Sequence, residues 1–166
     1  SKTAGDGVAI FATTHVRLGG GTWSNLASVP ASLSATSLRA AIQAMENTTD
    51  DRSRIQIVKP KYLVVNPALE WTARELLNSA YDPESGENAI NPLQTRNLSL
   101  IVDPYITSTT AFFLLAEKNP VICFQRRKPK FEQDGDFETG DAKFKSTFRM
   151  SVEVNHPMGL YKNAGA

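Results

Sequence analysis

The segment from Lys143 to Val154 constrains the fold more than any other part of the chain, because apolar and polar residues alternate along it. Its apolar positions are Phe144, Phe148, Met150, Val152 and Val154. Its polar positions are Lys143, Lys145, Thr147, Arg149, Ser151 and Glu153. A period of two residues is typical of a β-strand with one apolar side. We therefore predict a long strand with one buried face and one solvated face.

A different periodicity precedes this strand. From Ser34 to about Asn47, apolar residues recur at the spacing of one helix face, with Ser34 or Thr36 available as the N-cap. A second helix is predicted to start at Asn66-Pro67, directly after a buried strand at Tyr62–Val65, and to stop near Ala80. Further strands are expected at 98–102, 111–115 and 121–125, together forming a small sheet. This order of elements indicates an α+β fold.

Composition narrows the classes of function. The chain has 166 residues, 41% of them hydrophobic, which is enough for one ordinary domain with a core. Lysine and arginine number 18 against 17 acidic residues, so any binding of nucleic acid would have to be local. One cysteine and two histidines are poor material for a zinc site, and no cofactor is expected. The absence of a 20-residue apolar run and of a signal pattern predicts a soluble, unexported protein.

Catalytic signatures are lacking. His15 lies among threonines and could be combined on paper with a serine, but no Gly-x-Ser-x-Gly elbow occurs, and Cys123 has no flanking signature. We expect no catalytic residue, and we expect His15, Asn66 and His156 to serve as capping or hydrogen-bonding residues. The acidic stretch Asp134–Asp141 fails the pattern of a calcium loop in its glycine and glutamate positions, and a turn between two strands is favoured.

Two segments remain as candidate surfaces. The stretch from Tyr81 to Asn97 contains two prolines, one glycine and three asparagines, and such long loops are often functional. Four cations fall within five residues at Arg126, Arg127, Lys128 and Lys130. The simpler interpretation of these cations is a solvated strand end. The alternative is a patch that faces nucleic acid without reading its sequence.

Several phrases of the sequence, taken in order, carry a family resemblance. The phrase Asp-Gly-Val-Ala-Ile-Phe-Ala-Thr-Thr-His ending at His15 is followed by the glycine-rich turn at 18–25. In the strand-to-helix phrase at 61–77, Asn66 stands where a similar phrase, which enters its helix through Val-Pro-Pro, has the first proline. Further phrases lie at 91–93, 103–105, 111–114 and 135–140. Together these phrases resemble the Mu-type major head subunits of tailed bacteriophages.

This resemblance implies the capsid fold named for phage HK ninety-seven and a structural role in an icosahedral shell of a phage or prophage. The chain would be a single fragment, 1–166, with an axial-domain-like region at about 30–140 and a peripheral-type strand and tail at about 141–166. The loop would then meet neighbouring subunits, through residues such as Tyr81, Asp82, Glu84 and Arg96. The implied partners are copies of the chain itself in pentamers and hexamers, and packaged DNA bound non-specifically, with no membrane and no small-molecule substrate. Assembly would take place in the host cytoplasm, and the final location would be the virion capsid.

Three alternatives remain open on the sequence. An encapsulin-like compartment would share the same fold. A small α+β hydrolase would use His15, and a nucleic-acid adaptor would use Arg126 to Lys130. The chain starts without Met and soon enters the apolar segment Val8–Phe11, which suggests a cut start. By itself it is expected to be a monomer or a small oligomer.

Overall fold

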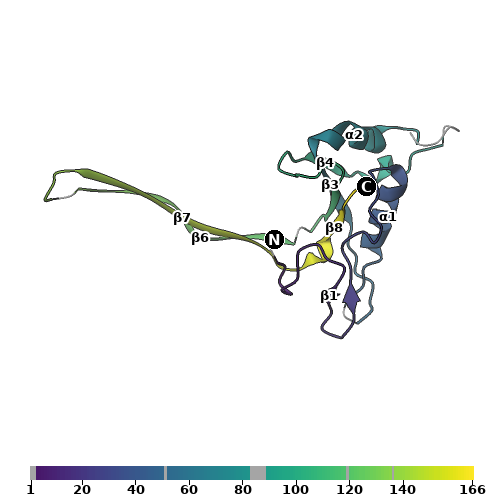
Figure 1. Cartoon of the computed structure of the whole chain (residues 1–166), viewed down its shortest axis with the longest axis horizontal. Coiled ribbons are helices and arrows are strands. Elements are labelled where there is room, and N and C mark those ends of the chain that lie inside the picture. Colours follow the sequence, from purple (N-terminus) through teal and green to yellow (C-terminus); the bar gives the residue numbers. More distant parts are fainter. Residues whose placement is uncertain (1–2, 51, 83–88, 119, 136) are drawn as a thin grey trace.

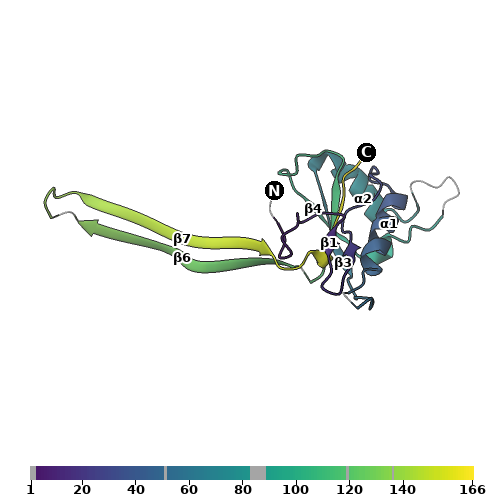
Figure 2. The same ribbon diagram turned by 60° about the horizontal axis from the view of Figure 1, so that its bottom comes forward.

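The computed structural model describes residues 3–50, 52–82, 89–118, 120–135 and 137–166. Figure 1 shows a body of sheet and helices at one end, from which a long two-stranded hairpin projects. The view in Figure 2, turned by 60°, shows the same separation between the hairpin and the body. The described chain therefore has an α+β fold, as the order of predicted elements indicated.

The body is built on a four-stranded sheet of order β4-β3-β5-β8. Its strands are β3 (Pro60–Val65), β4 (Ser99–Val102), β5 (Phe112–Ala116) and β8 (Leu160–Asn163). β3 runs parallel to β4 and antiparallel to β5, which in turn pairs antiparallel with β8. A separate two-stranded ribbon joins β1 (His15–Val16) to β2 (Thr22–Trp23).

The two predicted helices are present, and their starts have the expected chemistry. α1 (Ala35–Glu46) is capped by Ser34, which forms a reciprocal capping box with Ser37. Asn66 caps a 3₁₀ turn, η1 (Pro67–Leu69), that leads directly into α2 (Glu70–Asn78). Two further 3₁₀ turns are η2 (Gln94–Arg96) and η3 (Pro157–Gly159).

The sheet has a helix-covered face and a second face that meets the N-terminal segment. On the first face the paired residues Leu63 and Leu114 are fully buried in the main core, together with side chains of α1 and α2. On the second face Leu115 packs into a smaller cluster with Ala4 and Leu160. The N-terminal segment is therefore part of the folded body.

The hairpin departs from the sequence-based expectation. β6 (Val121–Gly135) pairs with β7 (Ala142–Val154), so the expected strand at 121–125 is much longer and the prediction that it joins the small sheet is wrong. β7 confirms the alternating strand, but its predicted buried face is wrong, because every β7 residue except Thr147 and Val154 is exposed. Hydrophobic alternation fixes which side chains share a face, whereas burial requires a second layer, which the described residues do not provide here.

The connection between β6 and β7 confirms the expected turn in the acidic stretch, since Gly135 and Ala142 are the last paired residues. The predicted division of the chain near residue 140 falls inside this connection. No helix in the described part of the chain has the length and apolar character needed to cross a membrane.

Candidate functional site: an exposed hairpin and its anchor

The β6–β7 hairpin has one apolar face and one charged face. Residues that pair across two strands point to the same side, so the register assigns each side chain to a face. The apolar side chains of the first face are Val121, Cys123, Phe131, Phe144, Phe148, Met150 and Val152, and the same face also carries Gln125, Gln133 and Ser146. The opposite face holds mainly charged residues, which are Arg127, Lys130, Glu132, Asp134, Lys143, Lys145, Arg149 and Glu153, with Ile122 and Phe124 nearer the body.

The apolar face is open to solvent. The exposed fractions are 67% for Phe131, 62% for Phe144, 64% for Phe148 and 52% for Met150. Phe131 and Phe144 stack across the strands, with ring centroids 5.8 Å apart. Several large apolar side chains exposed on one face of a protein surface mark an interaction site. An isolated two-stranded hairpin is also marginally stable in water, which again favours a covered state.

Two β-bulges distort β6 where the predicted cation cluster lies. The register shifts between Gln125 and Arg127 and again between Arg127 and Lys130. Arg127 lies directly opposite Arg149 of β7, and two like charges in such a pair repel each other. The cluster is exposed in this structure, and it lies in the middle of β6 and not at a strand end. Lys130 forms an ion pair with Glu132.

The loop candidates lie against α1. Asp82 forms an ion pair with Arg39, and Arg96 binds Glu46 through a hydrogen bond of 2.7 Å. Tyr81 makes an isolated bridge with Ile90 and is 58% exposed. Glu84 lies outside the described residues. The two charged candidates that can be described thus hold the loop to α1.

The base of the hairpin is anchored by the N-terminal segment. The Gly5 N–H donates to the carbonyl of Val154 at 3.2 Å, and a side chain at Gly5 would meet the Asn155 carbonyl oxygen at 2.6 Å. Trp23 of β2 stacks against His156, with ring centroids 6.2 Å apart. The segment therefore passes directly over the point where β7 returns to the body.

His15 is the buried centre of this anchor. Its side chain is 0% exposed, and it stacks on Trp23 with ring centroids 4.8 Å apart. Its Nδ1 lies 2.6 Å from Oδ2 of Asp6, and its Nε2 lies 3.1 Å from Oδ1 of Asn25. The hydrogen-bonding role predicted for His15 is confirmed, as is the capping role of Asn66. His156 caps η3 by accepting a hydrogen bond from the Met158 N–H.

The surroundings of the Asp6 carboxyl change its pKa. Burial by itself raises the pKa of the Asp6 carboxyl, but the hydrogen bonds from His15 and from the Val8 N–H outweigh it, so the pKa lies below its ordinary value. The ionised form of Asp6 is therefore the form that the folded chain stabilises.

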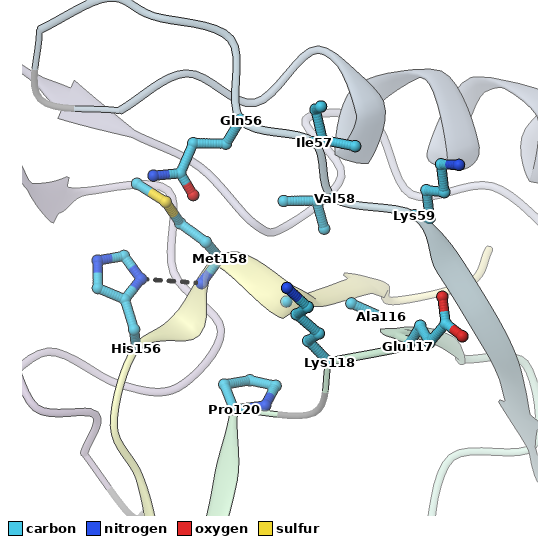
Figure 3. Close-up of a pocket in the computed structure, with 11 residues that line it drawn as sticks. Gln56, Ile57, Val58, Lys59, Ala116, Glu117, Lys118, Pro120, His156 and Met158 are labelled. Carbon is cyan, nitrogen blue, oxygen red and sulfur yellow. Dashed lines mark hydrogen bonds between the residues drawn. The ribbon is translucent and has the colours of Figure 1, made fainter.

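A groove lies where the hairpin joins the body. It has a volume of about 570 Å³ and is lined by the segment 56–59, by the end of β5 and by the segment around η3. Figure 3 shows the Lys118 side chain reaching into it between Pro120 and Ala116, with His156 turned toward Met158. The lining combines apolar side chains with Lys59, Glu117 and Lys118.

The chemistry available to these residues favours binding over catalysis. Both ring nitrogens of His15 have oxygen partners inside the protein, so in this arrangement the ring is committed to structural hydrogen bonds. In the part of the chain that the structure describes, three or more His, Cys, Asp or Glu side chains do not come together as a metal site.

The sequence of β6 carries further signals for the apolar face. Val121, Cys123 and Phe131 contribute to it from β6, but the two bulges and Pro129 interrupt their alternation. Proline in a strand is typical of bulges, so the break at Pro129 could have indicated a bulged partner for β7. Asp6 and Asn25 likewise occur in the phrases that carried the family resemblance, although no structural role followed from that.

Comparisons with known proteins agree with the resemblance. Part of the chain is 33% identical over 89 residues to the Mu-like prophage FluMu major head subunit of Haemophilus influenzae, which is 54% of this chain and 29% of that protein. The chain thus spans less than a third of that relative's length. A solved structure from Mycobacterium phage Che8 aligns with a TM-score of 0.49 and 15% identity, over 85% of this chain and 54% of that one. The model of the phage capsid protein family matches residues 2–163. The chain belongs to the phage capsid protein family.

Proposed function

We propose that the chain is part of a structural subunit of an icosahedral phage or prophage head shell, which acts by assembling with copies of itself into pentamers and hexamers. Its family and its head-subunit relative support this role over an encapsulin-like compartment or a hydrolase. The observation that carries the proposal is the exposed apolar face of the hairpin. No catalytic step is part of the proposed role, which takes place in the virion capsid after assembly in the host cytoplasm.

Burial of this face provides the driving force. Each phenylalanine removed from water contributes about 1.5–3 kcal/mol, and the face presents Phe131, Phe144 and Phe148. One such contact is modest, but an interface repeated by symmetry around a closed shell is made many times. In this proposal the body corresponds to the axial part of the subunit, and the whole hairpin, β6 included, to the peripheral part.

The loop at 81–97 is proposed as a second contact between subunits. Since Asp82 and Arg96 are paired with α1, we assign the contact to the exposed side chains Tyr81 and Ile90, and we assign the charged residues to holding the loop in place. Glu84, outside the described residues, remains a prediction from the sequence.

The cation cluster is proposed to face packaged DNA. Arg126, Arg127, Lys128 and Lys130 are exposed, and Lys143, Lys145 and Arg149 add cations from the neighbouring strand. Phosphate contacts through such groups are independent of sequence and weaken with salt. The double variant R127Q/R149Q should reduce the salt dependence of DNA binding by about two ion equivalents. The matched variant K59Q/K61Q, on the body, should leave it unchanged, and equal slopes for both variants would remove this part of the proposal.

Electron microscopy of the full-length gene product tests the proposed function as a whole. We expect closed particles with icosahedral symmetry. Protein that stays dispersed under the conditions in which it folds, or that forms open sheets or fibres, would contradict the proposal.

A further inference from the structure

We propose that Asp6, His15 and Asn25 form a clasp that fixes the base of the hairpin to the body and closes only while the His15 ring carries protons on both nitrogens. This inference goes beyond the proposed function, because a chain that never entered a shell would still show it.

The orientation of the Asn25 amide places one proton on Nε2 of the His15 ring. Its amide Nδ2 donates to the carbonyl of Ile10 at 2.7 Å, and its Oδ1 accepts from the Ala12 N–H at 2.9 Å. A flipped amide would set two donors against each other and two acceptors against each other, so this orientation is the one that satisfies both groups. The atom of Asn25 that faces His15 Nε2 is thus an acceptor, and Nε2 must be the donor.

The contact with Asp6 requires a second proton. His15 Nδ1 lies 2.6 Å from Asp6 Oδ2, a distance at which one of the two atoms must donate. If the ring were neutral with its proton on Nε2 and Asp6 were ionised, two lone pairs would face each other at this distance. The pair therefore holds a buried imidazolium next to a carboxylate that is partly exposed, joined by a charge-assisted hydrogen bond.

The clasp connects directly to the hairpin base. Asp6 follows Gly5, whose N–H binds the Val154 carbonyl at 3.2 Å. The Asn25 carbonyl accepts from the Lys162 N–H at 2.9 Å, and the His15 ring stacks on Trp23, which stacks on His156. Loss of the Asp6 contact frees the segment before Gly5 and weakens the support of β7 where it enters the body.

The other charged or titratable side chains nearby, Arg17 and His156, have other partners and do not take the place of the protonated His15 ring. Arg17, the residue after β1, donates to the Asp50 carbonyl at 3.0 Å. His156 lies beyond Trp23 and accepts from the Met158 N–H, so it is separated from the clasp by an indole ring. Asp6 is the carboxylate that faces His15, and the charge of the ring is balanced there.

The direction of the pH response follows from the protons counted. The closed clasp holds one proton more than a neutral ring would, so lower pH favours it as long as Asp6 stays ionised. It opens as the pH rises far enough to remove the second proton of the folded ring. At the acidic end it is lost again once Asp6 is protonated.

Nitrogen NMR of the histidine rings tests the clasp in the unmodified chain. The chain has two histidines, and the variant H156N, which keeps an acceptor for the Met158 N–H, assigns their signals. We expect both His15 ring nitrogens to be protonated at pH 6, with one proton lost at higher pH while the chain stays folded. A His15 ring with a single proton at every pH at which the chain is folded would overturn the proposal.

Hydrogen exchange at the Gly5 amide measures how strongly the base of the hairpin is held, because the Gly5 N–H donates to the Val154 carbonyl. After correction for the intrinsic effect of pH, protection at Gly5 should fall by about tenfold as the ring loses its second proton, which is the scale of one lost charge-assisted hydrogen bond. H15N, which cannot titrate, should show the lower protection at all pH values, and H156N should keep the response of the unmodified chain. A pH response in H15N equal to that of the unmodified chain would also overturn the proposal.

Discussion

Asp6 stabilises the body through hydrogen bonds that its ionised form accepts from His15 and Val8. The replacement D6N removes the charge and should lower the free energy of unfolding at pH 7 by about 2 kcal/mol, the scale of a hydrogen bond to a charged group. Because the pKa of Asp6 lies below its ordinary value in the folded chain, its contribution is present above about pH 4 and is lost as the pH falls further.

Urea unfolding at pH 7 and at pH 3 measures this effect. The difference between D6N and the unmodified chain should be smaller at pH 3, because the contribution of the Asp6 charge is lost as the pH falls below the ordinary pKa of aspartate. D141N is the matched control, because Asp141 lies exposed beyond the end of β6. A D6N difference that is the same at both pH values would contradict the role given to the charge.

Gly5 is a second position at which one residue decides the packing. A methyl group there would meet the Asn155 carbonyl oxygen at 2.6 Å, so the N-terminal segment or the hairpin base must shift. We expect G5A to destabilise the chain by about 1–3 kcal/mol, the usual cost of overpacking. G135A, where a methyl group meets nothing within 4 Å, should unfold at nearly the same temperature as the unmodified chain. Equal melting temperatures for the two variants would show that the close approach at Gly5 is unimportant.

At the scale of elements, the two faces of the β6–β7 hairpin have different proposed roles, since the apolar face binds other subunits and the charged face does not. Phe148 lies on the apolar face and Thr147 on the charged face of the same strand. In the full-length gene product, F148D should abolish particles, because it places an unpaired charge in the proposed interface. T147D introduces the same charge on the other face and should still assemble. Electron microscopy of the two variants decides between them, and particles formed equally by both would exclude the apolar face as the interface.

The elements that the sequence predicted well are those whose signals are local. The Ser34 cap with the apolar spacing of α1, the Asn66-Pro67 start before α2 and the alternation in β7 all lie within short windows. The strand before β7 was predicted only as far as residue 125, because the bulges around Arg127 break the alternation of β6. The exposure of the β7 apolar face was missed for a different reason, since alternation does not say whether the second layer belongs to the same chain.

The candidate site was predicted unevenly for similar reasons. The loop and the cation cluster were found by composition, but the ion pairs of Asp82 and Arg96 with α1 join residues about forty or more positions apart and leave no local pattern. The Asp6, His15 and Asn25 network was visible only as separate polar residues near glycines. Its geometry depends on the fold of the segment before α1, which has little regular secondary structure.

At the scale of the whole molecule, the β6–β7 hairpin projects from a body of sheet and helices (Figure 2). The apolar face of this hairpin is exposed to solvent. The chain thus presents a surface that folding alone does not bury. In the proposed assembly, neighbouring copies of the chain bury this surface. The anchor around His15 holds the base of the hairpin at the point from which it extends.

The single cysteine provides the most direct test of this account. Cys123 is exposed in the free chain and lies on the apolar face of the hairpin. A thiol reagent should modify it readily in the 166-residue chain and much more slowly in assembled particles of the full-length protein, at equal protein concentration and pH. Equal rates of modification in the free chain and in intact particles would contradict the claim that the apolar face is the surface buried in the shell.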